Sequence, residues 1–247
     1  MKRRKKSASR LFYRLVLISF LGGTAYLSWF QYARTHPKVV EIGELPDGFR
    51  SHGIDVSHYQ GEIDWEEVFA STDSIISFVY CKATEGTHFV DEHWLRNRSA
   101  LNGQKWRNGA YHFFSPNVSG AVQATHFLNH YDHLPTDMPP VLDAEVEGES
   151  DAKLISGMHE WLKIVEAKTK LKPIIYTSYH LYSTKFKTKF EGYVFWIASY
   201  NPDQSRVDDS SIKFWQYSDK GKIPGIDALV DLNFAKELYE TRKTLLR

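Results

Sequence analysis

The segment PPVLDAEVEG, residues 139–148, joins a short apolar run to two closely spaced acids. Residues 139–142 have the composition of a buried strand, and Asp143 and Glu145 follow at its carboxyl end. Side chains two positions apart on a strand point to the same side, so a rise of about 3.3 Å per residue would keep the two carboxyl groups within about 7 Å. A solvated strand end is the simplest explanation for such a pair. However, the position of the two acids directly after a buried strand favours a functional site.

Similar runs of β-branched and aromatic residues recur along the chain and indicate eight short strands: residues 53–59, 76–84, 109–114, 139–145, 173–178, 193–200, 212–219 and 229–235. Helical patterns fill the earlier gaps. Leu154, Met158, Trp161 and Val165 recur at helical spacing behind Ser150, which is suited to be the N-cap. The gaps between the last three strands are too short or too polar for long helices.

Strands that alternate with helices predict a parallel sheet, and eight of them favour a closed β/α barrel that lacks its late helices. A doubly wound open sheet is the alternative. No glycine-rich phosphate-binding loop of the usual spacing follows the first strand, and this absence favours the barrel.

The amino terminus combines a basic start with an apolar run. Seven of the 31 basic residues lie within the first fourteen positions, which contain no acid, and residues 15–33 carry no charge. This stretch is long enough to span a bilayer, and Trp29, Phe30 and Tyr32 would lie at the headgroup level. We therefore expect an N-terminal hydrophobic helix that acts as an uncleaved membrane anchor. A cleaved signal peptide is the alternative.

Because positive residues stay on the cytoplasmic side, either alternative places the remaining chain outside the cytoplasm. For a bacterial cell, we expect a single-pass membrane protein whose folded domain faces the periplasm or the cell surface, or a secreted protein if the signal is cleaved. The expected organisation is a basic stub with the anchor or signal peptide at 1–34, a linker at 35–50 and the barrel domain at 51–247.

Beyond position 14 the chain has 24 basic and 30 acidic residues, a net charge of −6. Nucleic-acid binding requires clustered positive charge on the folded domain, so nucleic acid is excluded as a partner. Cys81 is the single cysteine. The chain therefore cannot form an internal disulfide, and the apolar neighbours of Cys81 favour a buried filler over a nucleophile.

Active sites of β/α barrels lie at the carboxyl ends of the strands. The predicted strands place Asp55, Asp143, Glu145 and Asp231 at such ends. Two adjacent carboxyl groups in a partly desolvated site cannot both titrate normally, so the pKa of one rises and that group becomes a competent acid near neutral pH. This arrangement suits general acid catalysis on a glycosidic oxygen.

Other conspicuous residues have simpler explanations. His126, His130 and His133 lie on one predicted helix, but no glutamate follows His126 as in metalloproteases, and we expect surface histidines and no metal site. Several aromatic residues fall in the predicted strands: Tyr111, Tyr176, Trp196, Trp215 and Tyr217. Aromatic rings make good platforms for sugars, although core packing accounts for most of these residues individually.

Seven segments of the chain, in this order, resemble the family 25 glycoside hydrolases: GIDVSHYQGEIDW (53–65), CKATEGTHFVD (81–91), GAYHFF (109–114), VLDAE (141–145), PIIYTS (173–178), WIASY (196–200) and FWQYSDKGKIPGIDALVDLNFA (214–235). Members of this family are lysozymes that cut peptidoglycan between N-acetylmuramic acid and N-acetylglucosamine. The resemblance implies a modified barrel with five β/α units followed by three strands.

The resemblance also implies roles for individual residues. The catalytic acid of the family falls on Glu145, and its other carboxylates fall on Asp55, Asp143 and Asp231. The expected substrate-binding residues are Lys82, Tyr111, Tyr176, Trp196, Trp215 and Gln216. Neither a metal nor an organic cofactor is required. The expected partners are peptidoglycan glycan strands and, through the N-terminal segment, the membrane, and we expect a monomer.

Two mechanisms remain open. In both, Glu145 protonates the leaving oxygen and later activates water. Direct attack by a carboxylate would place Asp143 or Asp55 about 5 Å from Glu145. In the substrate-assisted route, which the resemblance favours, the 2-acetamido oxygen of the sugar attacks and Asp143 orients the amide.

Two other functions also remain open. The first is another N-acetylglycosaminidase, which would act on a chitin-like polymer. The second is a barrel that binds the cell wall without catalysis. The presence of all four acids argues against this last function, because a desolvated acidic cluster destabilises the fold and a protein that only binds does not need it.

Overall fold

The computed structural model describes residues 22–28, 42–135 and 137–237. The chain divides into two compact units, Met1–Val39 and Val40–Arg247. In the first unit, residues 22–28 are helical. The rest of the predicted span at 15–33 lies outside the described residues. Within the described part of the chain, we find no helix with both the length and the hydrophobicity needed to cross a membrane.

The second unit is a closed barrel. Eight strands pair around it in the order β1-β9-β8-β7-β6-β5-β4-β2, and β2 pairs with β1 to close the ring. The short β3 pairs with the carboxyl end of β2, at Thr84 and Glu85. The barrel strands β1, β2 and β4 to β8 are parallel to their neighbours, whereas β9 runs antiparallel to both β1 and β8. The strands are β1 (Ser51–Val56), β2 (Ile76–Glu85), β3 (Phe89–Val90), β4 (Arg107–Phe113), β5 (Val141–Asp143), β6 (Ile174–Ser178), β7 (Val194–Ala198), β8 (Ile212–Gly221) and β9 (Val230–Ala235).

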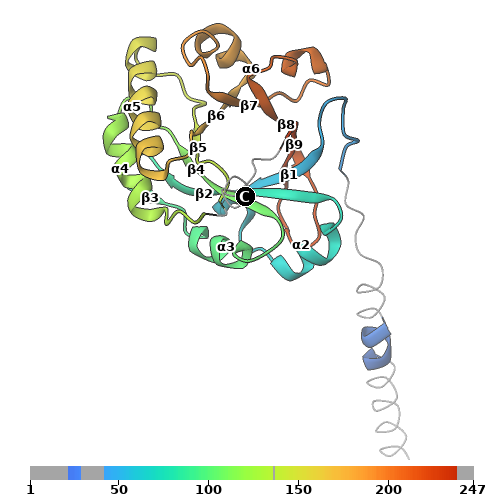
Figure 1. Ribbon diagram of the computed structural model, residues 1–247. Coiled ribbons are helices and arrows are strands. Elements are labelled where there is room, and N and C mark those ends of the chain that lie inside the picture. The colour runs from blue at the N-terminus through green and yellow to red at the C-terminus, as the bar shows by residue number, and fades with distance from the viewer. Residues whose placement is uncertain (1–21, 29–41, 136, 238–247) are drawn as a thin grey trace, which may run out of the picture. The chain divides into compact units, whose positions relative to one another are not determined.

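Helices follow the first five barrel strands, and Figure 1 shows them around the outside of the ring. The helices are α2 (Trp65–Thr72), α3 (Trp94–Leu101), α4 (Gly120–His130), α5 (Asp151–Thr169) and α6 (Tyr179–Leu181), which continues into a π-helical turn (Tyr182–Phe186). After β7, the only helical element among the described residues is a short 3-10 turn, Gln204–Val207. The prediction of five β/α units followed by three strands is therefore confirmed.

Local sequence explains the longest helix. The hydroxyl oxygen of Ser150 accepts a hydrogen bond from the backbone N–H of Lys153, so Ser150 is the N-cap of α5 as predicted. The predicted apolar positions from Leu154 to Val165 are buried against the barrel. α5 ends at Thr169, because Lys170 adopts a left-handed conformation with a φ of 62°.

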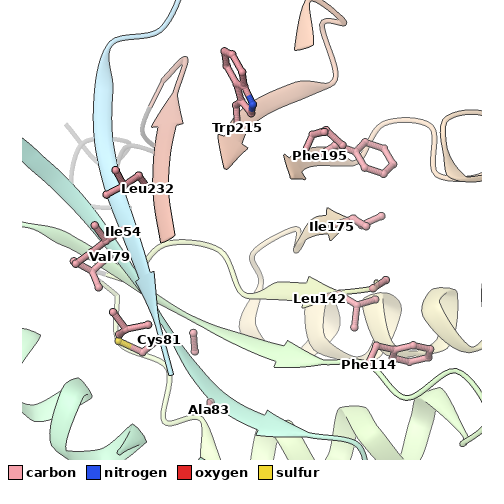
Figure 2. Packing of buried hydrophobic residues seen from close by; sticks show 14 of the residues in the cluster. Ile54, Val79, Cys81, Ala83, Phe114, Leu142, Ile175, Phe195, Trp215 and Leu232 are labelled. Carbon is pink, nitrogen blue, oxygen red and sulfur yellow. The ribbon is translucent and has the colours of Figure 1, made fainter. Parts of the chain in front are cut away.

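Alternation along the strands separates two hydrophobic layers. On β2, Phe78 and Tyr80 point into the barrel, whereas Val79 and Cys81 point outward toward the helices. Figure 2 shows the outer layer as a continuous set of side chains from successive strands. Cys81 is 1% exposed within this layer, as expected of a buried filler.

Residues 42–50 cover the wall of the barrel that lacks a helix. The ring of Phe49 lies 5.9 Å from the rings of both Trp215 on β8 and Phe234 on β9. The backbone N–H of Gly43 donates to the hydroxyl of Tyr217 at 3.2 Å. This segment thus replaces part of the apolar surface that a helix would bury elsewhere.

All eight predicted strands are present, with bounds shifted by a few residues. The strand predicted at 139–145 is shortened the most, since β5 covers only Val141–Asp143. β3 was not predicted, because two residues are too few to produce an alternating pattern.

Candidate active site

A pocket of about 300 Å³ lies at the carboxyl ends of the parallel strands. Its wall contains all four predicted carboxyl groups, from β1, from the end of β5 and from β9. It also contains five of the six predicted substrate-binding residues. The lining consists of Asp55, Ser57, Tyr59, Gln60, Lys82, Glu85, Tyr111, Phe113, Val141, Asp143, Glu145, Tyr176, Trp196, Gln216 and Asp231.

Asp143 is the last residue of β5 and is only 7% exposed. One of its carboxyl oxygens, Oδ1, is buried and has no hydrogen-bond partner in the described part of the chain. Burial raises the pKa of Asp143 well above its ordinary value, and the charges of Glu145 and Asp55 raise it further. An unpaired buried oxygen on a pocket wall is available to a donor group of a ligand.

Glu145 lies beyond the end of β5, where the backbone N–H of Ala144 still bonds to the carbonyl of Tyr176 at 2.9 Å. Solvent reaches Glu145 at the mouth of the pocket. The surrounding wall nevertheless removes much of the water around its carboxyl group, and this desolvation raises its pKa. The nearby hydroxyl of Tyr176 opposes this shift of the Glu145 pKa. A solvent-accessible carboxylic acid with a raised pKa can deliver a proton to a bound molecule.

Asp55 and Asp231 face each other across the antiparallel pairing of β1 and β9. Burial raises the pKa of both groups, and the charge of Asp55 contributes to a pKa of about 9 for Asp231. A hydrogen bond between the two carboxyl groups lowers the pKa of Asp55 and raises that of Asp231. Asp231 therefore carries the shared proton near neutral pH.

Amide side chains hold Asp55 in place. The Nδ2 group of Asn233 donates to Asp55 Oδ2 at 2.7 Å, and the Nε2 group of Gln216 donates to the same oxygen at 3.1 Å. The indole N–H of Trp196 donates to Asn233 Oδ1 at 2.9 Å. Trp196 lies in the pocket wall but is only 2% exposed. Its main role there is to fix the amide of Asn233, which orients Asp55.

Two tyrosine hydroxyls meet at Gln216. Tyr176 and Tyr200 each donate to Gln216 Oε1 at 2.9 Å. Since both lone pairs of this oxygen are used, the amide is fixed with its N–H directed at Asp55. Burial raises the pKa of Tyr176 well above its ordinary value, as it does that of Tyr111 on the same pocket wall. The hydroxyls of Tyr176 and Tyr111 are therefore neutral near physiological pH.

Lys82 brings a positive charge to the acidic pocket. Its ammonium group binds Glu85 Oε2 at 2.6 Å and lies 5.0 Å from the ring centroid of Phe113. The side chain is 6% exposed, against 39% for Glu85. Lys82 also lowers the pKa of both Asp143 and Glu145, which opposes the effect of burial on each.

The structure does not bring Trp215 into the pocket, contrary to the substrate-binding role predicted for it. Trp215 belongs to the outer layer, as Figure 2 shows, and its indole N–H donates to the carbonyl of Ser199 at 2.7 Å. The physical reason is strand alternation. Gln216 points inward, so its neighbour Trp215 must point outward.

The three histidines of the predicted helix contribute nothing to the pocket. His126 and His130 lie on α4 and His133 follows it, and all three are at least partly exposed. His126 Nε2 lies 2.9 Å from the carbonyl of Phe89. They are surface histidines, as expected.

Sequence reasoning missed several residues of the site. Asn233 stands two positions after Asp231 on one strand, so the same alternation that placed Asp231 could have found it. Glu85 lies three positions after Lys82, and this spacing on a strand does not indicate that the two side chains form an ion pair. Tyr59 lies in a 3-10 turn (His58–Gln60), where neither strand nor helix periodicity applies.

Comparison with known proteins is consistent with this geometry. The family model described as Glycosyl hydrolases family 25 matches residues 54–226. The chain is 41% identical to the uncharacterized protein YegX of Escherichia coli O6:H1 over 192 residues, which cover 76% of this chain and 71% of that one. It is 32% identical to Lysozyme M1 of Streptomyces globisporus, over 73% of this chain and 66% of the relative.

A solved structure shares the fold. A family 25 glycosyl hydrolase from Bacillus anthracis superimposes with a TM-score of 0.71 at 28% identity, over 83% of this chain and 96% of that one. The family match covers most of the barrel and includes Asp55, Asp143 and Glu145. The chain therefore belongs to glycosyl hydrolase family 25 and is a glycoside hydrolase.

Proposed function

We propose that this glycoside hydrolase is a lysozyme, an N-acetylmuramidase that hydrolyses the bond between N-acetylmuramic acid and N-acetylglucosamine in peptidoglycan. The observation that carries the proposal is the pocket in which Asp143 and Glu145, both with raised pKa, face Asp55 and Asp231. The relative named Lysozyme M1 supports the choice of substrate.

In this proposal, Glu145 is the general acid and then the general base. Desolvation keeps its carboxyl group protonated to a higher pH than in water, so it can protonate the leaving oxygen. After the aglycone leaves, the carboxylate takes a proton from the attacking water. The hydroxyl of Tyr176, which donates to Gln216 Oε1 in the structure, lies near Glu145 and would turn its single proton to the carboxylate in this second step.

The substrate-assisted route fits the surroundings of Asp143. The unpaired Oδ1 of Asp143 could accept the N–H of a 2-acetamido group and direct the acetamido oxygen at the anomeric carbon. Asp55, held by two amide donors, faces the same space and would stabilise the positive charge that develops on the sugar ring.

We also propose that the N-terminal segment anchors the enzyme, with a linker at 35–50 before the barrel domain at 51–247. The basic start and the uncharged run at 15–33 support this arrangement. The barrel would then act outside the cytoplasm of a bacterial cell, close to the wall polymer, as a monomer.

Replacing Glu145 by Gln should lower peptidoglycan hydrolysis by about 10²–10⁴-fold, because the amide cannot donate the proton. The measurement is mass spectrometry of borohydride-reduced digestion products of purified peptidoglycan. The wild type should release fragments that end in reduced N-acetylmuramic acid. Glu147→Gln is the matched control, since Glu147 is exposed and pairs with Lys185 at 2.7 Å, and this variant should keep full activity.

Products that end in reduced N-acetylglucosamine would instead identify another N-acetylglycosaminidase. Wall binding without any cleavage by the wild type would favour a non-catalytic barrel.

Replacing Asp143 by Asn should lower kcat by about 10²-fold or more, because the amide no longer orients and polarises the acetamido group. The substrate-assisted route further requires that wild-type enzyme fail on glycan strands whose sugars have been N-deacetylated. Both rates can be followed by release of reducing ends. Full activity of Asp143→Asn, or ready cleavage of the deacetylated strands, would rule out this route in favour of direct carboxylate attack.

Replacing Asp231 by Asn should stabilise the barrel increasingly as the pH rises from about 4 to 9. The unfolded carboxyl group ionises near its ordinary pKa of 3.8, whereas the folded one keeps its proton up to about 9, so the wild type loses stability across this window. Asn is neutral throughout and can still donate to Asp55. Thermal unfolding midpoints measured at several pH values test this prediction.

Asp209 provides the control of opposite sign. Its hydrogen bond with Lys187 lowers its pKa, so Asp209→Asn should destabilise the barrel at neutral pH and lose this effect in acid. A difference between wild type and Asp231→Asn that does not grow with pH would contradict the raised pKa of Asp231.

If the N-terminal segment is an uncleaved anchor, the full-length protein should stay in the membrane fraction after an alkaline wash, with residues 1–34 still attached. Mass measurement of the isolated protein tests both points. A soluble protein that begins after residue 20 would show that the segment is a cleaved signal peptide.

A further inference from the structure

Large aromatic side chains are exposed at three positions in the described part of the barrel unit, and all three lie around the pocket. Tyr59 is 77% exposed, Phe89 42% and Tyr200 54%. Tyr59 lines the pocket, the ammonium of Lys82 lies 5.5 Å from the ring of Phe89, and Tyr200 donates to Gln216. Exposed aromatic surface that gathers around one site indicates a binding surface.

Tyr59 and Phe89 form one shelf, joined by His58. The ring of His58 lies 4.2 Å from that of Tyr59 and 5.3 Å from that of Phe89. Asp91 holds His58 in place, since its Oδ2 accepts the backbone N–H of His58 at 2.9 Å and lies 2.8 Å from the ring Nδ1 of His58. The shelf is therefore ordered before any ligand binds, which lowers the entropic cost of binding.

The turn that carries Tyr59 is fixed as well. Ser57 and Gln60 form a capping box, and the Gln60 amide donates to the carbonyl of Leu229 at 2.9 Å. Tyr200 is held through its hydroxyl by the bond to Gln216 Oε1. All of these exposed rings thus have fixed supports, unlike ordinary surface side chains.

Strand order places the rings relative to the carboxyl groups. Three strands separate β5 from β9 in either direction around the barrel, so the Asp143–Glu145 side and the Asp231 side are opposite. Three strands likewise separate β2 from β7. The shelf lies at the ends of β1 and β2 and Tyr200 follows β7. A line from the shelf to Tyr200 therefore crosses the line that joins the two acidic sides.

We propose that a glycan strand crosses the barrel mouth along this line, from the Tyr59–Phe89 shelf to Tyr200. Pyranose rings on the two sides of the cleaved bond would stack on these aromatic faces while the central sugar enters the pocket. The apolar C–H face of a pyranose ring matches the flat apolar face that Tyr and Phe expose. This inference rests on the proposed function for the identity of the polymer, and on the structure for its path.

The test measures binding separately from turnover. Peptide-free glycan strands prepared from peptidoglycan are titrated into the full-length Glu145→Gln protein, with and without Tyr59→Ala, Phe89→Ala or Tyr200→Ala. Each alanine variant should raise the Kd about tenfold, and Tyr59→Ala with Tyr200→Ala about a hundredfold, because the two rings are far apart and act independently. Tyr59→Phe and Phe89→Tyr keep a ring and should bind as the parent does.

A second arm uses protein with Glu145 intact. Tyr59→Ala and Phe89→Ala should raise KM for long strands and leave kcat nearly unchanged, since these two rings bind ground state and transition state alike. A short substrate that spans only the scissile bond should show no such rise. Unfolding midpoints equal to that of the parent show that each variant is folded.

The outcomes separate the path from the activity. Wild-type cleavage combined with unchanged Kd values in the alanine variants would overturn the path and leave the activity standing. Ring-dependent strand binding without any wild-type cleavage would overturn the proposed activity and support the path. Absence of strand binding by the Glu145→Gln parent would overturn the path.

Discussion

The antiparallel pairing of β9 with β1 sets Asp231 directly opposite Asp55, and much of the barrel's polar interior is arranged around this contact. Two carboxyl groups this close and this poorly hydrated cannot both be ionised, so one proton is retained between them. Asn233 and Gln216 then supply donors for the charged partner. The acidic pair is tolerated because β9 closes the ring in the opposite direction to the other strands and carries Asp231 and Asn233 on the same face.

Two residues that were predicted to contact substrate instead hold the residues that orient Asp55. Trp196 and Tyr176 were predicted to bind substrate, and both border the pocket. Their polar atoms, however, bond to Asn233 and Gln216, which in turn hold Asp55. Buried indole and phenol groups need such partners, so these rings serve the inner core and orient the acid at the same time. Removing either ring would disturb the geometry of Asp55 before it affected any direct contact with a ligand.

Strand periodicity accounts for what could be predicted from the sequence. The eight runs of β-branched and aromatic residues were sufficient for the barrel, and the carboxyl ends of the parallel strands brought Asp55, Asp143 and Glu145 together. Asp231 was expected at such an end as well, but it lies at the amino end of β9, which reaches the same site because β9 is antiparallel. The same periodicity should have excluded Trp215, because its neighbour Gln216 was predicted to face the site. Contacts across the barrel were beyond reach, since the spacing of residues within one strand says nothing about which side chain lies opposite. The shelf of Tyr59 and Phe89 was beyond reach for the same reason, although it joins the ends of two neighbouring strands, β1 and β2.

The carboxyl groups and the exposed rings oppose folding for different reasons, yet both gather at one end of the barrel. Burial of Asp143 leaves an oxygen unpaired, and exposure of Tyr59 leaves an apolar ring in water. Neither feature helps to close the barrel, whose two hydrophobic layers are complete without them. A single extended ligand would relieve both, because an amide N–H can satisfy the carboxyl oxygen while flat sugar faces cover the rings. The unpaired carboxyl oxygen and the exposed rings at the barrel mouth therefore indicate the shape and polarity of a ligand that would fit there.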